Sequence, residues 1–253
     1  MGTTTMATRG VNSDMTATNN STWYEAVVAD IMQETPHAKT IALRLPHPLD
    51  HLAGQHYEIR LNAADGYQAA RLYSAASVPQ SHNILEVTVV DMPGGEVSPY
   101  LTEHLHTGDR VEVRGPLGRF FVWQPNDPRP VLLVAGGSGV APMRAILQAH
   151  DRVAATTPIH LLYSTRTAED IMYKDEFLPD PRVTITITGP PPADWQGNSG
   201  RINQLMVATA LHKVGGKPVC YVCGMNTFVE AAIALLLENG VPPALIKAER
   251  FGA

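Results

Sequence analysis

Cysteine is scarce in this chain: only Cys220 and Cys223 occur among its 253 residues. Two thiols cannot hold a chain of this length in a disulfide scaffold, and they are too few for an iron–sulfur cluster, which typically takes four thiolates. Long apolar runs are also missing, since no stretch reaches the roughly 18 residues of a membrane-spanning helix. The first residues lack the apolar segment of a secretory signal. We therefore expect a cytoplasmic protein without a membrane anchor.

Basic residues are in the minority. Lys and Arg number 19 against 24 Asp and Glu, a net charge of −5, so the chain lacks the basic face that nucleic-acid binding requires. The ten histidines have no spacing typical of a metal site, and we predict no bound metal. Seven of them are expected at the surface: His47, His51, His56, His82, His104, His106 and His150.

The length and the 44% apolar content indicate two folded domains. Residues 1–21, rich in Thr, Asn and Ser, are expected to form a disordered tail. Residues 22–124 contain short β-type runs separated by turn residues, which predicts an antiparallel barrel. One short helix is expected there, with Ser98 as its N-cap and Pro99 at its first position. The six runs cover residues 22–35, 38–46, 55–61, 70–77, 84–92 and 110–118.

A Pro-rich stretch, residues 124–130, marks the expected linker to a second domain over residues 125–253. Strands then alternate with helices, including a helix over 168–177, which predicts a doubly wound parallel sheet. For the last helix we predict a capping box made by Thr227 and Glu230. Ligands of such sheets bind at the carboxyl ends of the strands.

Three strand ends carry suggestive residues. Residues 135–142, AGGSGVAP, are either a tight turn or a loop that receives an anion at a helix start. After the next strand comes Ser164-Thr165-Arg166, where Arg166 is either a solvated side chain or a partner for the 2′-phosphate of NADP. The third end carries the two cysteines, which face opposite sides of a strand at this spacing. Cys220 is then core, and Cys223 can face a ligand.

In the barrel, the run RLYS (residues 71–74) places Arg71 and Tyr73 on one face of a strand. Arg71 suits a phosphate group and Tyr73 can stack on a planar ring. Ser74 faces the other way unless the strand ends there. The segment PGGEVSPYL (93–101) adds a second possible anion site at a helix start.

Taken together, these motifs resemble the ferredoxin–NADP reductase superfamily over about residues 22–253. The resemblance rests on seven segments in family order: RLYS, PGGEVSPYL, GPLGRFF (115–121), LLVAGGSGVAPM (132–143), LLYSTRTAEDIMYKDEF (161–177), YVCGMNTFVE (221–230) and ERFGA (249–253). It implies a six-stranded antiparallel Greek-key barrel that binds FAD, followed by a Rossmann-like α/β domain that binds NAD(P)H. It also implies hydride transfer from the nicotinamide to flavin N5.

The resemblance assigns roles to individual residues. In the barrel, Tyr73 would pack on the isoalloxazine, Ser74 would lie near N5, and Arg71 would bind the pyrophosphate. The other flavin contacts would be Leu72, Thr88, Gly95, Val97 and Ser98.

In the second domain, Gly137 and Ser138 would lie beside the nicotinamide, and Arg166 would meet the 2′-phosphate. Cys223-Gly224 would lie near nicotinamide C4. Glu249 and Phe251 would come close to the flavin. Ser74, Cys223 and Glu249 form the expected catalytic set.

The family usually has Pro after Cys-Gly, where this chain has Met225. The resemblance includes neither a ferredoxin nor a globin domain, so we expect a stand-alone reductase that passes electrons to a separate protein, such as a ferredoxin, an oxygenase or a molybdenum enzyme. FAD is favoured over FMN, and NADPH over NADH. Two alternatives stay open: an NAD(P)H:flavin reductase that treats flavin as a substrate, and a non-catalytic flavin or nucleotide sensor. The oligomeric state is open as well.

Overall fold

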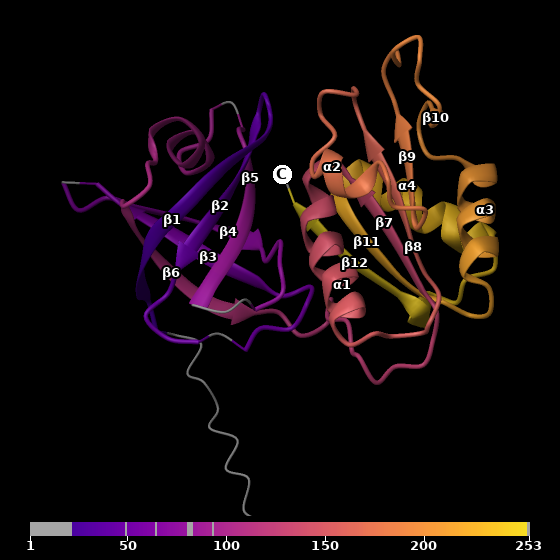
Figure 1. Ribbon diagram of the computed structural model, residues 1–253, viewed down its shortest axis with the longest axis horizontal. Coiled ribbons are helices and arrows are strands. Elements are labelled where there is room, and N and C mark those ends of the chain that lie inside the picture. Colours follow the sequence, from indigo (N-terminus) through magenta and orange to yellow (C-terminus); the bar gives the residue numbers. More distant parts are fainter. Residues whose placement is uncertain (1–21, 49, 64, 80–82, 93, 252–253) are drawn as a thin grey trace, which may run out of the picture.

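A computed structural model describes residues 22–251 except 49, 64, 80–82 and 93. The predicted disordered tail, residues 1–21, lies outside the described residues. Two bodies lie side by side, an all-β body formed by the first half of the chain and an α/β body formed by the second (Figure 1).

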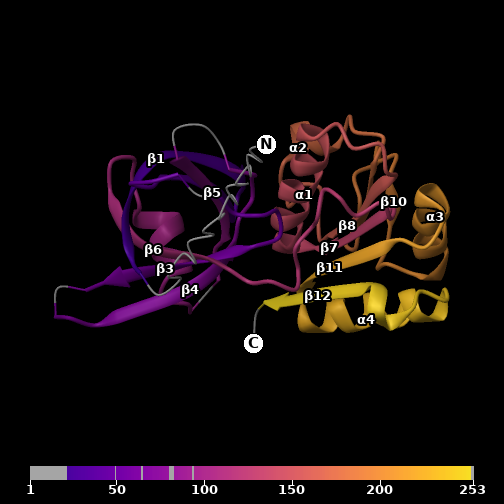
Figure 2. The same ribbon diagram turned by 90° about the horizontal axis from the view of Figure 1, so that it is seen from below.

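The first body is the predicted antiparallel barrel. Its sheet has the order β4-β3-β6-β1-β2-β5, and a bridge between Ala75, the residue after β4, and Val87 of β5 brings the two edges together. The β3–β4 hairpin projects away from the second body (Figure 2). All six predicted strands are present: β1 (Tyr24–Thr35), β2 (Ala38–Arg44), β3 (His56–Asn62), β4 (Gln68–Ser74), β5 (Ile84–Val90) and β6 (Arg110–Leu117).

One short helix, η2 (Tyr100–His104), packs against the barrel core through Leu101. The predicted Ser98 N-cap is wrong: Pro99 occupies that position and no side chain caps the helix. The Ser98 hydroxyl instead accepts a hydrogen bond from the Met92 N–H at 3.3 Å. The Ser98 side chain therefore bonds to the preceding turn instead of capping the helix.

The second body is a parallel sheet with the order β10-β9-β8-β7-β11-β12. Because β8 and β11 lie on opposite sides of β7, the chain reverses its direction of winding between β7 and β11. Such a switch point leaves a crevice at the carboxyl ends of the two strands. The strands are β7 (Val131–Gly136), β8 (Ile159–Thr165), β9 (Val183–Ile187), β10 (Asn198–Ser199), β11 (Val219–Met225) and β12 (Ile246–Phe251).

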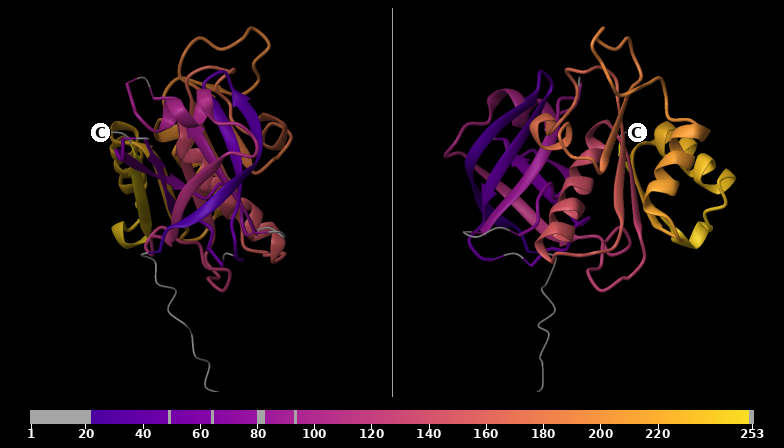
Figure 3. Two further views of the ribbon diagram at one scale, coloured as in Figure 1. Left: turned by 90° about the vertical axis from the view of Figure 1, so that its left-hand side faces the viewer. Right: turned by 45° about the vertical axis from the view of Figure 1, so that its right-hand side comes forward.

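Helices cover both faces of this sheet (Figure 3). Helix α1 (Val140–Arg152) packs on the face nearest the barrel. Helices α3 (Gln204–Val214) and α4 (Asn226–Glu238) pack on the other face. The apolar cluster under α1 also includes Ala76, Phe121 and Trp123, so one continuous core joins the two bodies.

Two helix predictions are wrong. Only α2 (Lys174–Phe177) is helical within 168–177, because Asp170 accepts hydrogen bonds from Thr167 in a turn and Tyr173 has φ +55°. The capping box of α4 is absent as well: β11 runs directly into the helix, Met225 is the N-cap residue, and no side chain caps it. Thr227 is already inside the helix and cannot act as its N-cap.

Two histidines predicted at the surface are buried. His51 is 3% exposed and His150 is 6% exposed. The His51 Nε2–H donates to the Ser77 carbonyl at 2.8 Å, so its Nδ1 accepts from the Tyr57 hydroxyl at 3.1 Å. The exposed positions of His47, His104 and His106 match the prediction, and His82 lies outside the described residues.

His160 is buried in β8, on the face covered by α3. Its Nε2 lies 2.9 Å from the Thr184 hydroxyl, and the Lys213 ammonium lies 3.0 Å from the same oxygen. Burial lowers the pKa of His160 to about 4, and the Lys213 charge acts in the same direction. The folded protein therefore holds this imidazole neutral.

We predict that His160 contributes to acid sensitivity. Between pH 6.5 and about 4 the unfolded chain binds a proton at His160 that the folded chain does not. The contribution of neutral His160 to the free energy of unfolding is therefore complete above pH 6.5. It falls as the pH is lowered, by up to about 1.4 kcal/mol per pH unit. Urea unfolding across this range should show a shallower loss for His160→Gln than for wild type. His104→Gln, at an exposed site, should behave as wild type, and equal slopes for all three proteins would contradict the assignment.

Candidate active site between the two domains

Glycines lie at the ends of β7 and β11, where the switch point is located. A Cβ on Gly136 or on Gly224 would lie 2.7 Å from a ring carbon of Phe228, and a Cβ on Gly139 would lie 2.1 Å from the Cys223 carbonyl oxygen. These three positions admit no side chain because backbone and ring pack directly on them. Gly137 differs: it has φ +54°, and a Cβ there would meet no atom within 4 Å, so it faces open space. One side of the loop is therefore closely packed, and the other side is accessible.

The two cysteines lie on opposite faces of β11, as predicted. Cys220 packs in the cluster under α3 and α4, and Cys223 packs in the cluster shared with α1. Cys223 is only 1% exposed and pairs in register with Glu249 of β12. Burial, and secondarily the Glu249 charge, raise the pKa of the Cys223 thiol. The thiol therefore stays protonated and is unsuited to act as a nucleophile.

Glu249 brings the second domain into contact with the barrel. Its Oε1 lies 3.7 Å from Nδ1 of His56, and both side chains are about a quarter exposed (26% and 21%). His56 sits directly opposite Ser74 in the β3–β4 ladder. The structure thus brings Ser74, Glu249 and Cys223, the three predicted catalytic residues, to one region. His56 belongs to the same region but was predicted only as a surface residue, because the strand register that places it there is not readable from the sequence.

The predicted flavin strand has the expected alternation. Tyr73 packs against the barrel core, and burial raises the pKa of its hydroxyl. The exposed Arg71 shares that strand face, and its Nη2 lies 3.9 Å from Oε2 of Glu96. Leu72 points the other way and is 57% exposed. Ser74 is the last residue of β4 and is half-buried.

The predicted flavin contacts in the turn before η2 are Gly95, Val97 and Ser98. The Gly95 N–H donates to the Met92 carbonyl at 2.8 Å, and a Cβ on Gly95 would lie 3.0 Å from that oxygen. Val97 is 1% exposed and points into the barrel core, and Ser98 is 8% exposed. Among these three predicted flavin contacts, Gly95 is the one that is exposed.

Thr88, also predicted to contact the flavin, has a different environment. It is 6% exposed, and its hydroxyl hydrogen-bonds to the hydroxyls of Tyr173 and Thr40, the latter at 2.8 Å. Tyr173 belongs to the α/β domain, so Thr88 lies between the domains with its hydrogen-bonding capacity used there.

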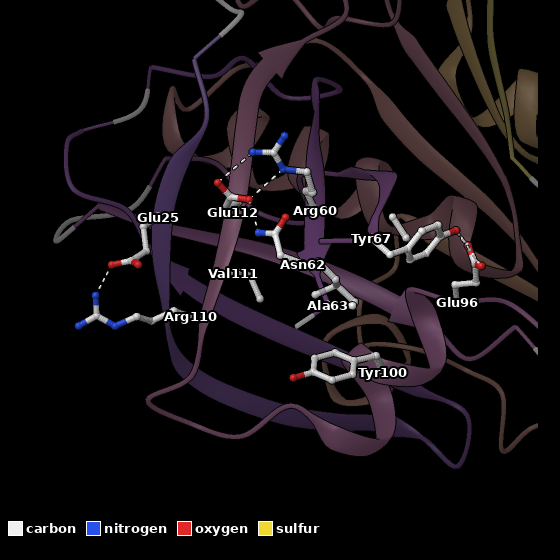
Figure 4. Close-up of a pocket in the computed structure, with 12 residues that line it drawn as sticks. Glu25, Arg60, Asn62, Ala63, Tyr67, Glu96, Tyr100, Arg110, Val111 and Glu112 are labelled. Atoms are coloured by element: carbon white, nitrogen blue, oxygen red, sulfur yellow. Dashed lines mark hydrogen bonds and ion pairs between the residues drawn. The ribbon is translucent and has the colours of Figure 1, made fainter. Parts of the chain in front are cut away.

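A pocket of about 580 Å³ opens beside the flavin strand. Figure 4 shows its wall: Tyr67 beside Glu96, Tyr100 below them, and the Arg60–Glu112 ion pair opposite. The lining also includes Ala69, which lies on the same face of β4 as Arg71 two residues further along. The pocket is therefore lined by the same face of β4 that carries Arg71 and Tyr73.

At the end of β8, the residues near the predicted nucleotide site differ in their exposure to solvent. Ser164 and Thr165 are buried, and the Thr165 hydroxyl donates to the Asp170 carbonyl at 3.2 Å. Arg166 is exposed. On the neighbouring loop Ser138 is half-buried, and Phe251 is the last described residue of β12, opposite Met225.

Two domain-family models match the chain. The oxidoreductase FAD-binding domain covers residues 25–122, and the oxidoreductase NAD-binding domain covers residues 133–233. A ferredoxin–NADP reductase B of Sorangium cellulosum is 32% identical over 213 residues, which are 79% of this chain and 84% of that protein. The chain belongs to the ferredoxin–NAD(P) reductase family. The predicted resemblance, and the predicted FAD and NAD(P)H, are thereby confirmed.

Other members of the family are longer. The phenol hydroxylase P5 protein of Acinetobacter pittii is 29% identical over 236 residues, 90% of this chain but only 65% of that protein. A solved structure, the ferredoxin reductase in carbazole 1,9a-dioxygenase, has a TM-score of 0.80 and 29% identity, and the match covers 91% of this chain and 69% of that one. The present chain thus spans about two thirds of the length of these relatives.

Two features are absent from the described part of the chain. Within it, no helix combines the length and apolarity needed to cross a membrane. The same residues contain no group of three or more His, Cys, Asp or Glu side chains placed to hold a metal ion.

We predict that the packing of Gly139 on Cys223 protects the thiol. Gly139→Ala places a methyl group against the Cys223 carbonyl, so β11 must shift, at a cost of about 1–3 kcal/mol. Cys223 should then react faster with a thiol reagent, as followed by mass spectrometry. Gly137→Ala is the matched control: it strains the backbone at φ +54° but meets no atom. Equal Cys223 labelling rates in the two variants would contradict this account.

Proposed function

We propose that this chain takes a hydride from NAD(P)H onto bound FAD and passes the electrons to a separate acceptor protein. The observation that carries the proposal is the convergence of Ser74, Glu249 and Cys223 from three strands of two domains beside the open Gly137 loop. A flavin held by the barrel and a nicotinamide held by the α/β domain would meet at this convergence.

The flavin nucleotide is proposed to lie along β4. Alternate residues on one strand face are about 6.6 Å apart. Tyr73, Arg71 and Ala69 therefore form a row on this face. Tyr73 provides an aromatic ring, Arg71 provides a positive charge, and Ala69 lines the open pocket. The isoalloxazine would pack at Tyr73, the pyrophosphate would bind Arg71 and the backbone near Gly95, and the adenosine would enter the pocket lined by Tyr67 and Tyr100. This row is longer than FMN needs and fits FAD.

The nicotinamide nucleotide is proposed to bind the crevice at the switch point. Gly137 and Ser138 would line its floor, and the N–H groups at the start of α1 would face an anion bound there. Arg166 is the exposed cation at the end of the neighbouring strand, which favours NADPH over NADH. Asp170 does not compete for a ribose hydroxyl because it is hydrogen-bonded within its own turn.

A bound flavin would accept a hydride from nicotinamide C4, which would convert NAD(P)H to NAD(P)⁺, and it could then release the two electrons one at a time. The protein's residues position and desolvate the reactants. Cys223, neutral and buried, limits how closely a nicotinamide ring can approach β11. Ser74 and Glu249 bracket the same space from the barrel and from β12. No residue has to remove a proton, because the hydrogen leaves carbon as hydride.

The acceptor is proposed to be a redox protein of an oxygenase system. This rests on relatives such as the reductase component of the naphthalene 1,2-dioxygenase system of Pseudomonas putida, which is 27% identical over 245 residues. Anaerobic mixing with NADPH or NADH should bleach the flavin, and ferricyanide should restore its colour. A protein that loses its flavin on gel filtration but reduces added flavin would instead favour a flavin reductase. Flavin that no nicotinamide bleaches would favour a sensor.

We predict that Arg71 retains the flavin. Arg71→Ala removes a charge-assisted contact worth roughly 1.5–3 kcal/mol, so the Kd for FAD should rise roughly 10- to 150-fold. Stability should hardly change, because the pair with Glu96 is exposed. The measurement is fluorescence titration of the apoprotein with FAD and, separately, with FMN. Arg129→Ala, which breaks a surface pair with Asp127, should leave the Kd unchanged. An unchanged Kd for Arg71→Ala would remove Arg71 from the site.

We predict that substitutions of Cys223 change the rate of flavin reduction, whereas substitution of Cys220 changes the stability of the fold. Cys223→Ser should slow flavin reduction modestly. Cys223→Ala, which leaves a gap, should slow it further, because a misplacement of about 1 Å can cost on the order of 100-fold. FAD should bind both variants normally. Cys220→Ala, the matched control in the other core cluster, should lower the melting temperature and leave the rate intact. Stopped-flow reduction by NADPH measures the rates, and a slow Cys220→Ala with a fast Cys223→Ala would reverse the assignment.

A further inference from the structure

A buried arginine ties the barrel to the α/β domain. Arg144 lies on α1, on the side of the sheet next to the barrel (Figure 1), and its side chain is only 13% exposed. Its Nη1 donates to Oε2 of Glu86 at 2.7 Å and to the Ala76 carbonyl at 3.2 Å, both in the barrel. Its Nε and Nη2 donate to Glu176 of α2 at 2.6–3.0 Å. One guanidinium thus connects both domains through two carboxylates.

A second arm of the contact runs through Tyr173. The Arg144 guanidinium lies 4.7 Å from the centre of the Tyr173 ring. The Tyr173 hydroxyl bonds to Thr88 of the barrel, and its N–H donates to Glu34 of the barrel at 3.0 Å. Tyr173 adopts φ +55°, an uncommon conformation for a bulky residue, which surrounding structure must hold in place. We call Arg144, Glu86, Glu176, Tyr173 and Thr88 the interdomain clamp.

The clamp is close in sequence to both halves of the proposed site. Ala76, whose carbonyl accepts from Arg144, follows Ser74 by two residues, on the chain that leaves the flavin strand. Arg144 itself lies on the first turns of α1, the helix that the Gly137–Gly139 loop opens. A shift of Arg144 relative to Ala76 would therefore move the nicotinamide loop relative to the flavin strand.

We propose that Arg144 is a positioning residue for hydride transfer, because it fixes the barrel and the α/β domain at the separation that the two reactants require. This inference rests on the proposed function. Apolar packing between the domains tolerates small sliding, because it has no preferred direction. A planar guanidinium bound to two carboxylates and a carbonyl has a fixed geometry, which a nonpolar side chain at this position cannot reproduce. The clamp therefore sets an orientation that the shared apolar core does not.

The test compares Arg144→Met with Arg182→Met. Arg182 is the matched control: it also binds two carboxylates, Asp180 and Asp151, but both lie within the α/β domain. Both variants should lose stability. Only Arg144→Met should slow flavin reduction at saturating NADPH, on the order of 10- to 100-fold, with the Kd values for FAD and NADPH unchanged. Tyr173→Phe, which removes only the hydroxyl contact to Thr88, is the milder variant and should show a smaller effect of the same kind if Arg144→Met does not fold.

A second readout does not depend on activity. Spin labels at Met32→Cys in the barrel and Leu205→Cys in α3 report the distance between the domains; these sites are 59% and 76% exposed, and the native thiols are buried. The distance distribution should be narrow in the wild-type background, broader with Arg144→Met, and unchanged with Arg182→Met. Full-rate reduction in Arg144→Met, or an unchanged distribution, overturns the positioning role. If NADPH and NADH both fail to reduce the wild-type protein, the proposed function itself fails, and this role fails with it.

Discussion

The proposed function places a distance constraint between the two domains, and the domain interface is the feature on which it depends. A hydride moves only when donor and acceptor atoms lie about 3–3.5 Å apart with their orbitals aligned, yet one reactant is assigned to the barrel and the other to the parallel sheet. The fold meets this constraint by making the domain boundary part of the core. Ala76, Phe121 and Trp123 of the first half pack in the same apolar cluster as α1. The Tyr221 hydroxyl also donates to the Val122 carbonyl at 2.9 Å, which fixes the connecting segment to the sheet.

The same constraint explains the glycines at the switch point. A reactant held by a loop is only as well placed as the loop, and side chains at Gly136, Gly139 or Gly224 would separate β7, β11 and α4. Their absence lets the loop backbone rest on the Cys223 backbone and on the Phe228 ring. Gly137 alone needs its glycine for a positive φ rather than for space. Gly136, Gly139 and Gly224 are thus required for close packing, and Gly137 is required for its backbone conformation.

Features with a short sequence period were predictable. The alternation in RLYS placed Arg71 and Tyr73 on one face of β4, and the spacing of Cys220 and Cys223 put them on opposite faces of β11. Features that depend on long-range register were not. His56 meets Glu249 only because β3 pairs with β4 and because β12 ends against the barrel. Local capping signals failed where tertiary structure left them no place: Thr227 resembles an N-cap, but β11 passes into α4 without a loop.

The hydrogen bonds of Thr88 show a role that its neighbourhood in the sequence does not predict. Thr88 lies in a barrel strand and carries a hydroxyl, which fits a flavin contact, but that hydroxyl is bonded to Thr40 and to Tyr173, 85 residues away in the chain. A buried hydroxyl without a partner would cost about 1–3 kcal/mol, so its partners define its role. The partner here belongs to the other domain and adopts a strained φ, and strain of that kind persists only where the surroundings over-determine it. The polar groups buried between the domains are therefore part of the contact that fixes the orientation of the barrel relative to the α/β domain.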